Sequence, residues 1–316
     1  MSLARQYLQD AELNRQLAEQ GFVVIPWLSK EEVTSLKLKF ESAHDVEMPS
    51  FYATSHHQDT DFRKSMSQAI TDVLKPHADA TFRDCELLGA SFITKTKDES
   101  GKLQPHQDWN IVDENQYRSF NIWVPLVDLT AENGAIEVLP KSHNWVRGYR
   151  HSSIECAYRQ VHDLVWENMK PLYLKAGQAL IYDHALLHAS TANQTNEWRT
   201  ACASGIIPAE AQMYFYWNEN GVVEQYESNA DYFMTQNIFQ KPVGLTKVDD
   251  LEYSFPVVDR KEFYQFIGKE MPEKMEPIPE TENHIATQTE TRSFWKVYTP
   301  MNILREIHFR LTSKNG

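Results

Sequence analysis

One alternating stretch decides the fold class of this chain: Phe120-Asn121-Ile122-Trp123-Val124-Pro125-Leu126. Successive side chains of a β-strand point to opposite faces, so the even-numbered apolar residues share one face, and Asn121 and Trp123 share the other. We expect the apolar face to pack against a layer of helices. Asn121 and Trp123 are then expected to point into the space that the sheet encloses.

The same period of two recurs from about residue 86 onward, in short segments separated by turns such as Glu132-Asn133-Gly134 and Ala176-Gly177. The expected strands are 87–96, 119–128, 135–139, 171–175, 178–182, 199–207 and 212–217. A run of many short strands of this kind is typical of a β-sandwich or barrel.

Helical patterns dominate before residue 86. We expect a helix over residues 1–20 that ends at Gly21, and a short buried strand closed by Pro26. The capping box Ser29-Lys30-Glu31-Glu32 opens a second helix. A loop over 50–60 leads to a third helix that carries Phe62, Met66, Ile70, Val73 and Leu74. Helices followed by many strands indicate a β-sandwich or barrel backed by helices.

These patterns suggest three parts. Residues 1–85 form a helical layer with one edge strand in the same domain as the core, and 86–240 form that core. Residues 144–170 are an insertion between strands, and long insertions at the mouth of a barrel are often lids or substrate loops. Residues 241–316 form an extension of open role, with a helix expected from Thr299-Pro300.

Composition excludes several classes of protein. The 316 residues are 41% hydrophobic, which excludes general disorder, and the net charge of −13 disfavours nucleic acid and anionic membranes as partners. Only three cysteines occur, without a CxxC pair, so neither a disulfide framework nor a zinc ribbon is indicated. No apolar run is long enough to span a membrane. We expect a cytoplasmic protein that binds a small molecule; its oligomeric state is left open.

The pattern His-x-Asp occurs three times, so spacing alone cannot select a metal site. In a strand, residues i and i+2 share a face and can hold one ion from one side. Only His106-Gln107-Asp108 lies between two expected strands. His57-Gln58-Asp59 falls in a polar loop. His77-Ala78-Asp79 falls at an expected helix end, where a histidine is an ordinary choice. We therefore expect metal ligands at His106 and Asp108.

A third ligand is available eighty residues later, where His184 and His188 are both candidates. Two imidazoles and one carboxylate can hold one face of an Fe(II) ion and leave the other face open. Arg199 follows, and a guanidinium can bind the far carboxylate of an acidic co-substrate through two parallel hydrogen bonds. Its small neighbours Ala201 and Ala203 argue against an ordinary surface salt bridge. This combination indicates oxygen chemistry.

The stretch from His106 to Arg199 resembles the phytanoyl-CoA dioxygenase family of Fe(II)/2-oxoglutarate-dependent oxygenases, and the likeness extends over residues 15–210. The matching segments are His106-Gln107-Asp108, residues 121–126, residues 132–143, His188-Ala189-Ser190 with Asn193 and Arg199, and the early strand 21–26. Two departures lie outside the ligand set. Lys141 stands where the family usually has Gly, and Gln178 where it usually has Asp.

The resemblance implies a mainly β fold with flanking helices around a double-stranded β-helix (jelly-roll, cupin-like) core. It implies that His106, Asp108 and His188 bind Fe(II), which favours His188 over His184. The co-substrates would be 2-oxoglutarate and O2. An aspartate at position 108 favours hydroxylation of an unactivated C–H bond, with release of succinate and CO2. Desaturation, ring closure and epimerisation use the same ligands.

The resemblance also implies a co-substrate pocket. Arg199 would bind the distal carboxylate of 2-oxoglutarate, with Ser190 assisting and Trp123 lining the pocket. Plain core packing explains Trp123 equally well.

Other functions stay open at this point. One alternative is a non-catalytic β-helix module that binds a ligand, and another is a cupin-type isomerase that needs no 2-oxoglutarate. Zinc hydrolysis is disfavoured because no general base lies nearby in sequence. A coenzyme A thioester would need basic residues for its phosphates. Six basic residues are candidates for binding these phosphates, and each is equally well explained as a solvated loop charge. They are Lys95, Lys97, Lys102, Arg147, Arg150 and Arg159. A small metabolite is favoured, with aromatic residues of 50–60 and 144–170 shaping its pocket.

Overall fold

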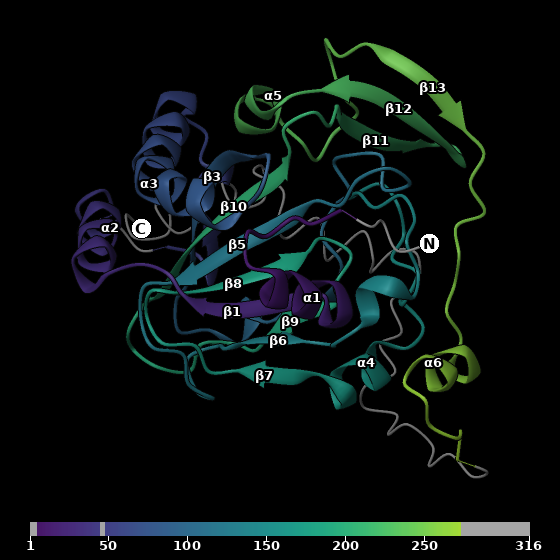
Figure 1. Ribbon diagram of the computed structural model, residues 1–316, viewed down its shortest axis with the longest axis horizontal. Coiled ribbons are helices and arrows are strands. Elements are labelled where there is room, and N and C mark those ends of the chain that lie inside the picture. The colour runs from purple at the N-terminus through teal and green to yellow at the C-terminus, as the bar shows by residue number, and fades with distance from the viewer. Residues whose placement is uncertain (1–4, 45–47, 273–316) are drawn as a thin grey trace, which may run out of the picture. The chain divides into compact units, whose positions relative to one another are not determined.

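Two antiparallel sheets form the centre of the computed structural model, which describes residues 5–44 and 48–272 (Figure 1). Their strands are β1 (Phe22–Pro26), β2 (Phe51–Ala53), β3 (Cys85–Lys95), β4 (Leu103–His106), β5 (Phe120–Pro125), β6 (Ile136–Val138), β7 (Lys170–Leu172), β8 (Gln178–Asp183), β9 (His188–Ser190) and β10 (Arg199–Pro208). The larger sheet has the order β1-β8-β5-β10-β3-β2, and the smaller has β4-β9-β6-β7.

Between β3 and β10 the chain passes repeatedly from one sheet to the other. Strands β3, β5, β8 and β10 belong to the larger sheet, and β4, β6, β7 and β9 belong to the smaller. Eight strands connected in this way make a double-stranded β-helix, or jelly roll. The mainly β fold expected from the sequence is therefore confirmed, with β1 and β2 added at the two edges of the larger sheet.

The alternation in β5 separates two cores, as expected. Ile122 packs outward in a cluster that includes Leu17 of helix α1 (Ala11–Gln20). Trp123 points the other way and packs with Ile136 and Leu180, which come from the two facing sheets. The space between the sheets is thus a packed core next to which a site can be held rigidly.

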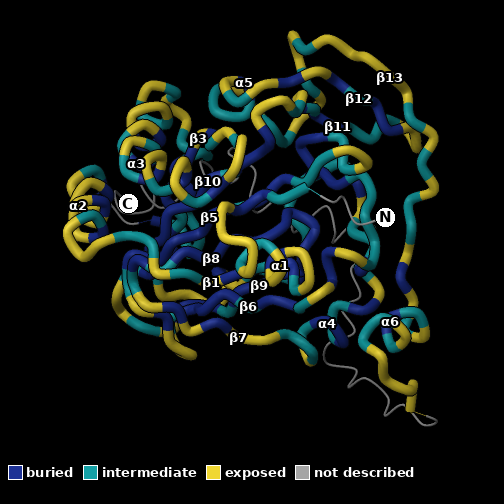
Figure 2. The backbone as a smooth tube through the Cα atoms, in the orientation of Figure 1, coloured by how far each residue is buried: buried dark blue, intermediate teal, exposed yellow. Residues whose placement is uncertain are grey.

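Helices α2 (Lys30–Ser42) and α3 (Thr60–Thr81) cover the larger sheet at β3 and β10. Both sides of the expected capping box are present, since Ser29 and Glu32 bond each other's backbone N–H. Phe40 and Ile70 pack against Phe92 of β3. Figure 2 shows the result, with buried strands under helices whose outer faces are exposed.

Two helix predictions need correction. The first helix begins at Ala11 instead of near the N-terminus, because the Asp10 side chain accepts hydrogen bonds from the N–H groups of Glu12 and Leu13 and caps the helix there. Leu8 instead forms a bridge to Phe82. The second correction concerns His77, which lies inside α3, because the helix continues through Pro76 to Thr81.

The expected strands all occur, with ends that differ by a few residues. The sequence patterns missed β2, which lies in the expected 50–60 loop, and the short strands β4 and β9. The other α-helices and strands missed are α4 (His162–Asn168), β12 (Val222–Ser228), α5 (Ala230–Thr235), β13 (Lys247–Leu251) and α6 (Arg260–Phe266). Strands β12 and β13 form a separate three-stranded sheet with β11 (Met213–Glu219).

The chain divides into two compact units, one ending at Asp259 and one starting at Arg260. The described part of the second unit contains α6 (Arg260–Phe266). The expected helix from Thr299-Pro300 lies outside the described residues. Among the helices that the structure describes, none has the length and apolar character needed to cross a membrane.

Candidate metal centre

Three potential ligands meet where two strands of the smaller sheet pair. His106 is the last residue of β4 and His188 is the first residue of β9, and the two are cross-strand partners. Asp108 follows just after β4, in a loop instead of the strand surroundings expected. One ligand atom from each residue lies within 4.8 Å of the other two. Asp108 Oδ1 is 3.6 Å from His188 Nε2 and 4.0 Å from His106 Nε2.

Backbone carbonyls orient both imidazoles in the same manner. His106 Nδ1 lies 2.7 Å from the carbonyl oxygen of Gln104, and His188 Nδ1 lies 3.0 Å from that of Leu186. A carbonyl only accepts, so each Nδ1 carries the proton and each Nε2 presents a lone pair. This is the usual way in which a protein fixes a metal-binding histidine.

The carboxylate of Asp108 is held by one of its two oxygens. Asn121 Nδ2 and the Tyr182 hydroxyl donate hydrogen bonds to Oδ2, at 3.2 and 3.0 Å. This leaves Oδ1 facing the histidines. Burial by itself raises the pKa of Asp108. The neighbouring His188 and other histidines together have a larger and opposite effect, and they lower this pKa to about 2. The aspartate is therefore ionised at neutral pH, as a metal ligand must be.

The centre is open on one side. The side chains of His106 and Asp108 are 39% and 26% exposed, whereas that of His188 is 7% exposed. The edge formed by His106 and Asp108 is therefore accessible to solvent.

The other histidines considered from the sequence lie elsewhere. His57 accepts a hydrogen bond from the N–H of Asp59, whose side chain caps α3. His77 pairs with Glu32 at 2.8 Å. His184 is buried outside the ligand cluster, with Nδ1 2.9 Å from Ser119 Oγ.

Arg199 begins β10 and is 2% exposed. Its guanidinium lies 5.5 Å from the ring centre of Trp123, and its Nε and one terminal nitrogen have no hydrogen-bond partner. Burial lowers the pKa of Arg199 to about 10, so it still carries its charge at neutral pH. A buried cation without a partner is costly unless an anion binds there. Trp123 packs in the core and also faces Arg199, and a role in lining a co-substrate pocket stays a prediction.

A second basic side chain is buried beside Arg199. Lys95 is the cross-strand partner of Arg199 and is fully buried. Its Nζ lies 2.6 Å from Ser190 Oγ and hydrogen-bonds the carbonyl oxygens of Ser190 and Thr191. Burial, together with the charge of Arg199, lowers the pKa of Lys95 to about 5. Within the described part of the chain, no carboxylate pairs with Arg199 or Lys95. From the sequence, Lys95 is a candidate only for phosphate binding, because its position opposite Arg199 depends on strand register.

Comparison with protein families gives a match that covers more than half of this chain. The model of the phytanoyl-CoA dioxygenase family matches residues 17–201. The chain belongs to this family. That range contains all six residues singled out above as ligands or pocket residues: His106, Asp108, Trp123, His188, Ser190 and Arg199.

Individual relatives of this phytanoyl-CoA dioxygenase family member are distant. "Dioxygenase andF" of Emericella variicolor is 29% identical over 90 residues, and this match spans only 27% of that protein and 28% of this chain. Among solved structures, the epimerase SnoN in complex with Fe3+, α-ketoglutarate and nogalamycin RO is 19% identical, with a TM-score of 0.48 over 79% of this chain and 97% of SnoN. HygX of Streptomyces hygroscopicus, with nickel, 2-oxoglutarate and hygromycin B bound, is 17% identical, with a TM-score of 0.43 over 64% of this chain and 88% of HygX.

Fe(II), 2-oxoglutarate and O2 are the cofactor and co-substrates of the phytanoyl-CoA dioxygenase family, and the residues of this site fit the first two. Two Nε2 lone pairs and one ionised carboxylate form the mixed nitrogen and oxygen donor set of a facial iron site. The unpaired guanidinium of Arg199 fits a dicarboxylate whose far end is anionic.

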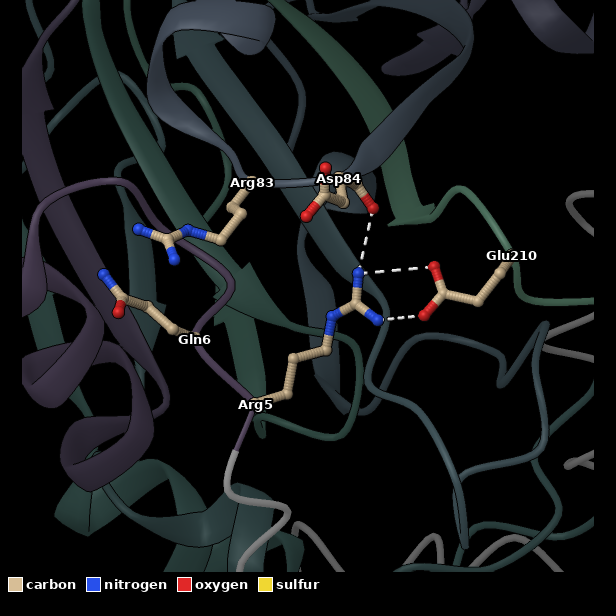
Figure 3. A pocket seen from close by; sticks show the side chains of 5 residues that line it. All are labelled: Arg5, Gln6, Arg83, Asp84 and Glu210. Carbon is tan, nitrogen blue, oxygen red and sulfur yellow. Dashed lines mark hydrogen bonds and ion pairs between the residues drawn. The ribbon is translucent and has the colours of Figure 1, made fainter.

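A surface pocket lies elsewhere on this phytanoyl-CoA dioxygenase family member (Figure 3). It has a volume of about 440 Å³ and is lined by Arg5, Gln6, Arg83, Asp84 and Glu210. Arg5 pairs with Glu210 across it and donates a 2.9 Å hydrogen bond to the carbonyl oxygen of Asp84. None of the candidate ligands lines this pocket, and we assign it no part in the chemistry.

Proposed function

We propose that this chain is an Fe(II)/2-oxoglutarate-dependent dioxygenase that hydroxylates an unactivated C–H bond of a small metabolite. The observation that carries the proposal is the pairing of the His106, Asp108 and His188 cluster with Arg199, a buried guanidinium that lacks a partner. Neither a cupin-type isomerase nor a plain ligand-binding module needs that second feature.

Each residue has a definite task in this proposal. His106, Asp108 and His188 hold Fe(II), while Arg199 and Lys95 bind the distal carboxylate of 2-oxoglutarate. Two further residues position these two basic side chains: Ser190 hydrogen-bonds Lys95, and Trp123 stacks against Arg199. When bound, the iron and 2-oxoglutarate supply the oxidative chemistry: R–H, 2-oxoglutarate and O2 give R–OH, succinate and CO2. The protein contributes fixed geometry.

The substrate is proposed to be a free metabolite instead of a coenzyme A thioester. The six cations considered for binding phosphates all have partners within the chain. Lys95 bonds Ser190 and Thr191, Lys97 bonds Asn196, Lys102 lies over the Trp166 ring, Arg147 pairs with Asp183, Arg150 with Glu114, and Arg159 with Glu155. Arg147 and Arg150 are largely buried and therefore are not the solvated loop charges that the sequence suggested.

An aromatic cluster that includes Trp109, the residue after Asp108, is the surface we propose for such a substrate. Trp109 follows Asp108, and its ring centre lies 4.1 Å from that of His151 and 5.5 Å from that of Phe239. His56 contacts Phe239 in turn. His56 and His151 come from the 50–60 segment and the 144–170 insertion, as the proposed substrate pocket requires. Rings of this kind favour a carbon-rich molecule.

The test is a screen of metabolite pools with the protein, Fe(II) and 2-oxoglutarate, followed by mass spectrometry. We expect a substrate-dependent gain of one oxygen atom with stoichiometric succinate. Loss of two hydrogens would indicate desaturation or ring closure, and an unchanged mass with succinate formation would indicate epimerisation. Turnover without 2-oxoglutarate would favour the isomerase, and failure to bind iron or 2-oxoglutarate would favour the binding module.

Binding of 2-oxoglutarate is expected to take up one proton. With a pKa of about 5, Lys95 is neutral in the free protein at pH 7, and an arriving carboxylate favours its charged form. Because the complex binds one more proton than the free protein, the affinity should fall as pH rises above about 5, until the raised pKa of Lys95 in the complex is reached. Calorimetry in two buffers of different ionisation enthalpy measures this uptake. Lys95→Met should abolish it, and a wild-type value near zero would contradict the placement of Lys95 beside the carboxylate.

The three cysteines Cys85, Cys156 and Cys202 are all free thiols. This supports the proposed cytoplasmic location, because thiols persist in a reducing compartment.

A further inference from the structure

The 144–170 insertion reaches the main chain of the candidate ligand Asp108 through one side chain. Arg150 Nε donates a 2.8 Å hydrogen bond to the carbonyl oxygen of Asp108. The backbone N–H of Arg150 donates a 2.7 Å hydrogen bond to Asn110 Oδ1, two residues further along the same loop. Arg150 therefore bonds the loop that carries the ligand at both Asp108 and Asn110, and Gln107 of the same loop donates a 3.1 Å hydrogen bond to the carbonyl oxygen of Val146 in the insertion.

The guanidinium of Arg150 is itself fixed by an acidic partner. Its two terminal nitrogens bond the two carboxylate oxygens of Glu114, at 2.9 and 2.5 Å, in a bidentate pair. Both side chains are 9% exposed. Water competes little with a pair this deeply buried, so the guanidinium plane and the direction of Nε are set.

A second arginine of the insertion continues the network away from the metal centre. Arg147 pairs with Asp183 at 2.5 Å and lies 3.5 Å from Glu114, and its side chain is 17% exposed. Over the described residues, 5–44 and 48–272, the bonds of Arg147 do not include Asp108. Two arginines of one insertion thus share a buried acidic environment, but of these two only Arg150 bonds Asp108 and Asn110.

We propose that Arg150 is a positioning residue that holds the main chain of Asp108 so that its side chain faces the two histidines. This inference rests on the proposed function, since it assumes that Asp108 binds the metal. Asn121 and Tyr182 orient the carboxylate itself, whereas Arg150 fixes the backbone from which that carboxylate extends. The insertion then acts as a brace for the metal centre.

Only an arginine can make both contacts, which suggests a sharp test. A lysine at position 150 keeps a positive charge for Glu114, but its single nitrogen cannot also replace Nε at the Asp108 carbonyl. The matched control is Arg147→Lys, the same change at a neighbouring buried ion pair. For each apoprotein we would measure the thermal midpoint, and then the affinity for Fe(II) by anaerobic calorimetry without 2-oxoglutarate.

We expect Arg150→Lys to weaken Fe(II) binding by about 10- to 100-fold, the range seen when a group that orients a ligand is lost. Arg147→Lys should bind Fe(II) within about twofold of wild type, although both changes disturb a buried ion pair. The proposal would be overturned if Arg150→Lys bound Fe(II) with wild-type affinity. It would also be overturned if both variants lost the same Fe(II) affinity in proportion to the drop in their thermal midpoints.

A second variant covers the case in which Arg150→Lys does not fold. Glu114→Gln keeps the shape of the partner and removes its charge, so it should loosen the guanidinium and weaken Fe(II) binding, and unchanged affinity would again overturn the proposal. Failure of the proposed function has a different outcome. A wild-type protein that binds Fe(II) through Asp108 but forms no succinate would refute the dioxygenase and leave the role of Arg150 intact.

Discussion

Asp108→Ala is expected to abolish succinate formation from 2-oxoglutarate. The change removes the anionic member of the ligand set and leaves two imidazoles, which cannot fix the ion or balance its charge. Altering groups that merely orient a ligand costs about 10- to 100-fold in affinity or activity, so loss of the ligand itself should exceed about 100-fold. Succinate assays and Fe(II) calorimetry measure the two effects, and undiminished turnover would refute the ligand assignment.

The chain supplies its own control for this experiment. Asp79 belongs to another His-x-Asp pattern but lies on the surface of α3, where it pairs with Lys75 at 2.9 Å. Exposed pairs of this kind add little to stability. Asp79→Ala should therefore leave Fe(II) affinity and succinate formation as in wild type. Equal losses in Asp79→Ala and Asp108→Ala would mean that the assay reports a general effect of such substitutions.

The features that sequence predicts well are those that depend on neighbours along the chain. Strict alternation in β5 determines which of its faces meets the helices, and this holds for Ile122 and Trp123. The capping box at Ser29 is equally local. The spacing of His106 and Asp108 also makes them a candidate pair. They are preferred to the same pattern at His57 and His77 because only they lie between two expected strands.

Features that depend on strand register could not be predicted from the local sequence pattern. Strand β9 has three residues and β4 has four, too few to show a period, yet their pairing places His106 opposite His188. Lys95 and Arg199 are separated by more than a hundred residues and meet only because β3 pairs with β10 in one register. The start of α1 was missed because the hydrogen bonds of the Asp10 cap outweigh the apolar pattern that precedes it.

Arg199→Leu is expected to weaken 2-oxoglutarate binding by more than about 100-fold. A hydrogen bond to a charged group is worth about 1.5–3 kcal/mol, and a guanidinium can make two of them to one carboxylate. Leucine fills much of the same buried space and adds no unsatisfied polar group. Fe(II) affinity should stay at the wild-type value, because Arg199 is not among the candidate ligands. Calorimetry with Fe(II) and then with 2-oxoglutarate measures both quantities in one preparation.

A matched co-substrate isolates the interaction with the far carboxylate. 2-Oxopentanoate has the chelating keto acid of 2-oxoglutarate and a methyl group in place of the distal carboxylate. Wild type should prefer 2-oxoglutarate strongly, and Arg199→Leu should lose most of that preference because only Lys95 then remains to meet the far carboxylate. Arg159→Leu, the same substitution at an arginine that pairs with Glu155 away from the site, should retain it. If Arg199→Leu still discriminated fully between the two keto acids, Lys95 alone would have to bind the carboxylate, and the double variant with Lys95→Met would then remove the preference.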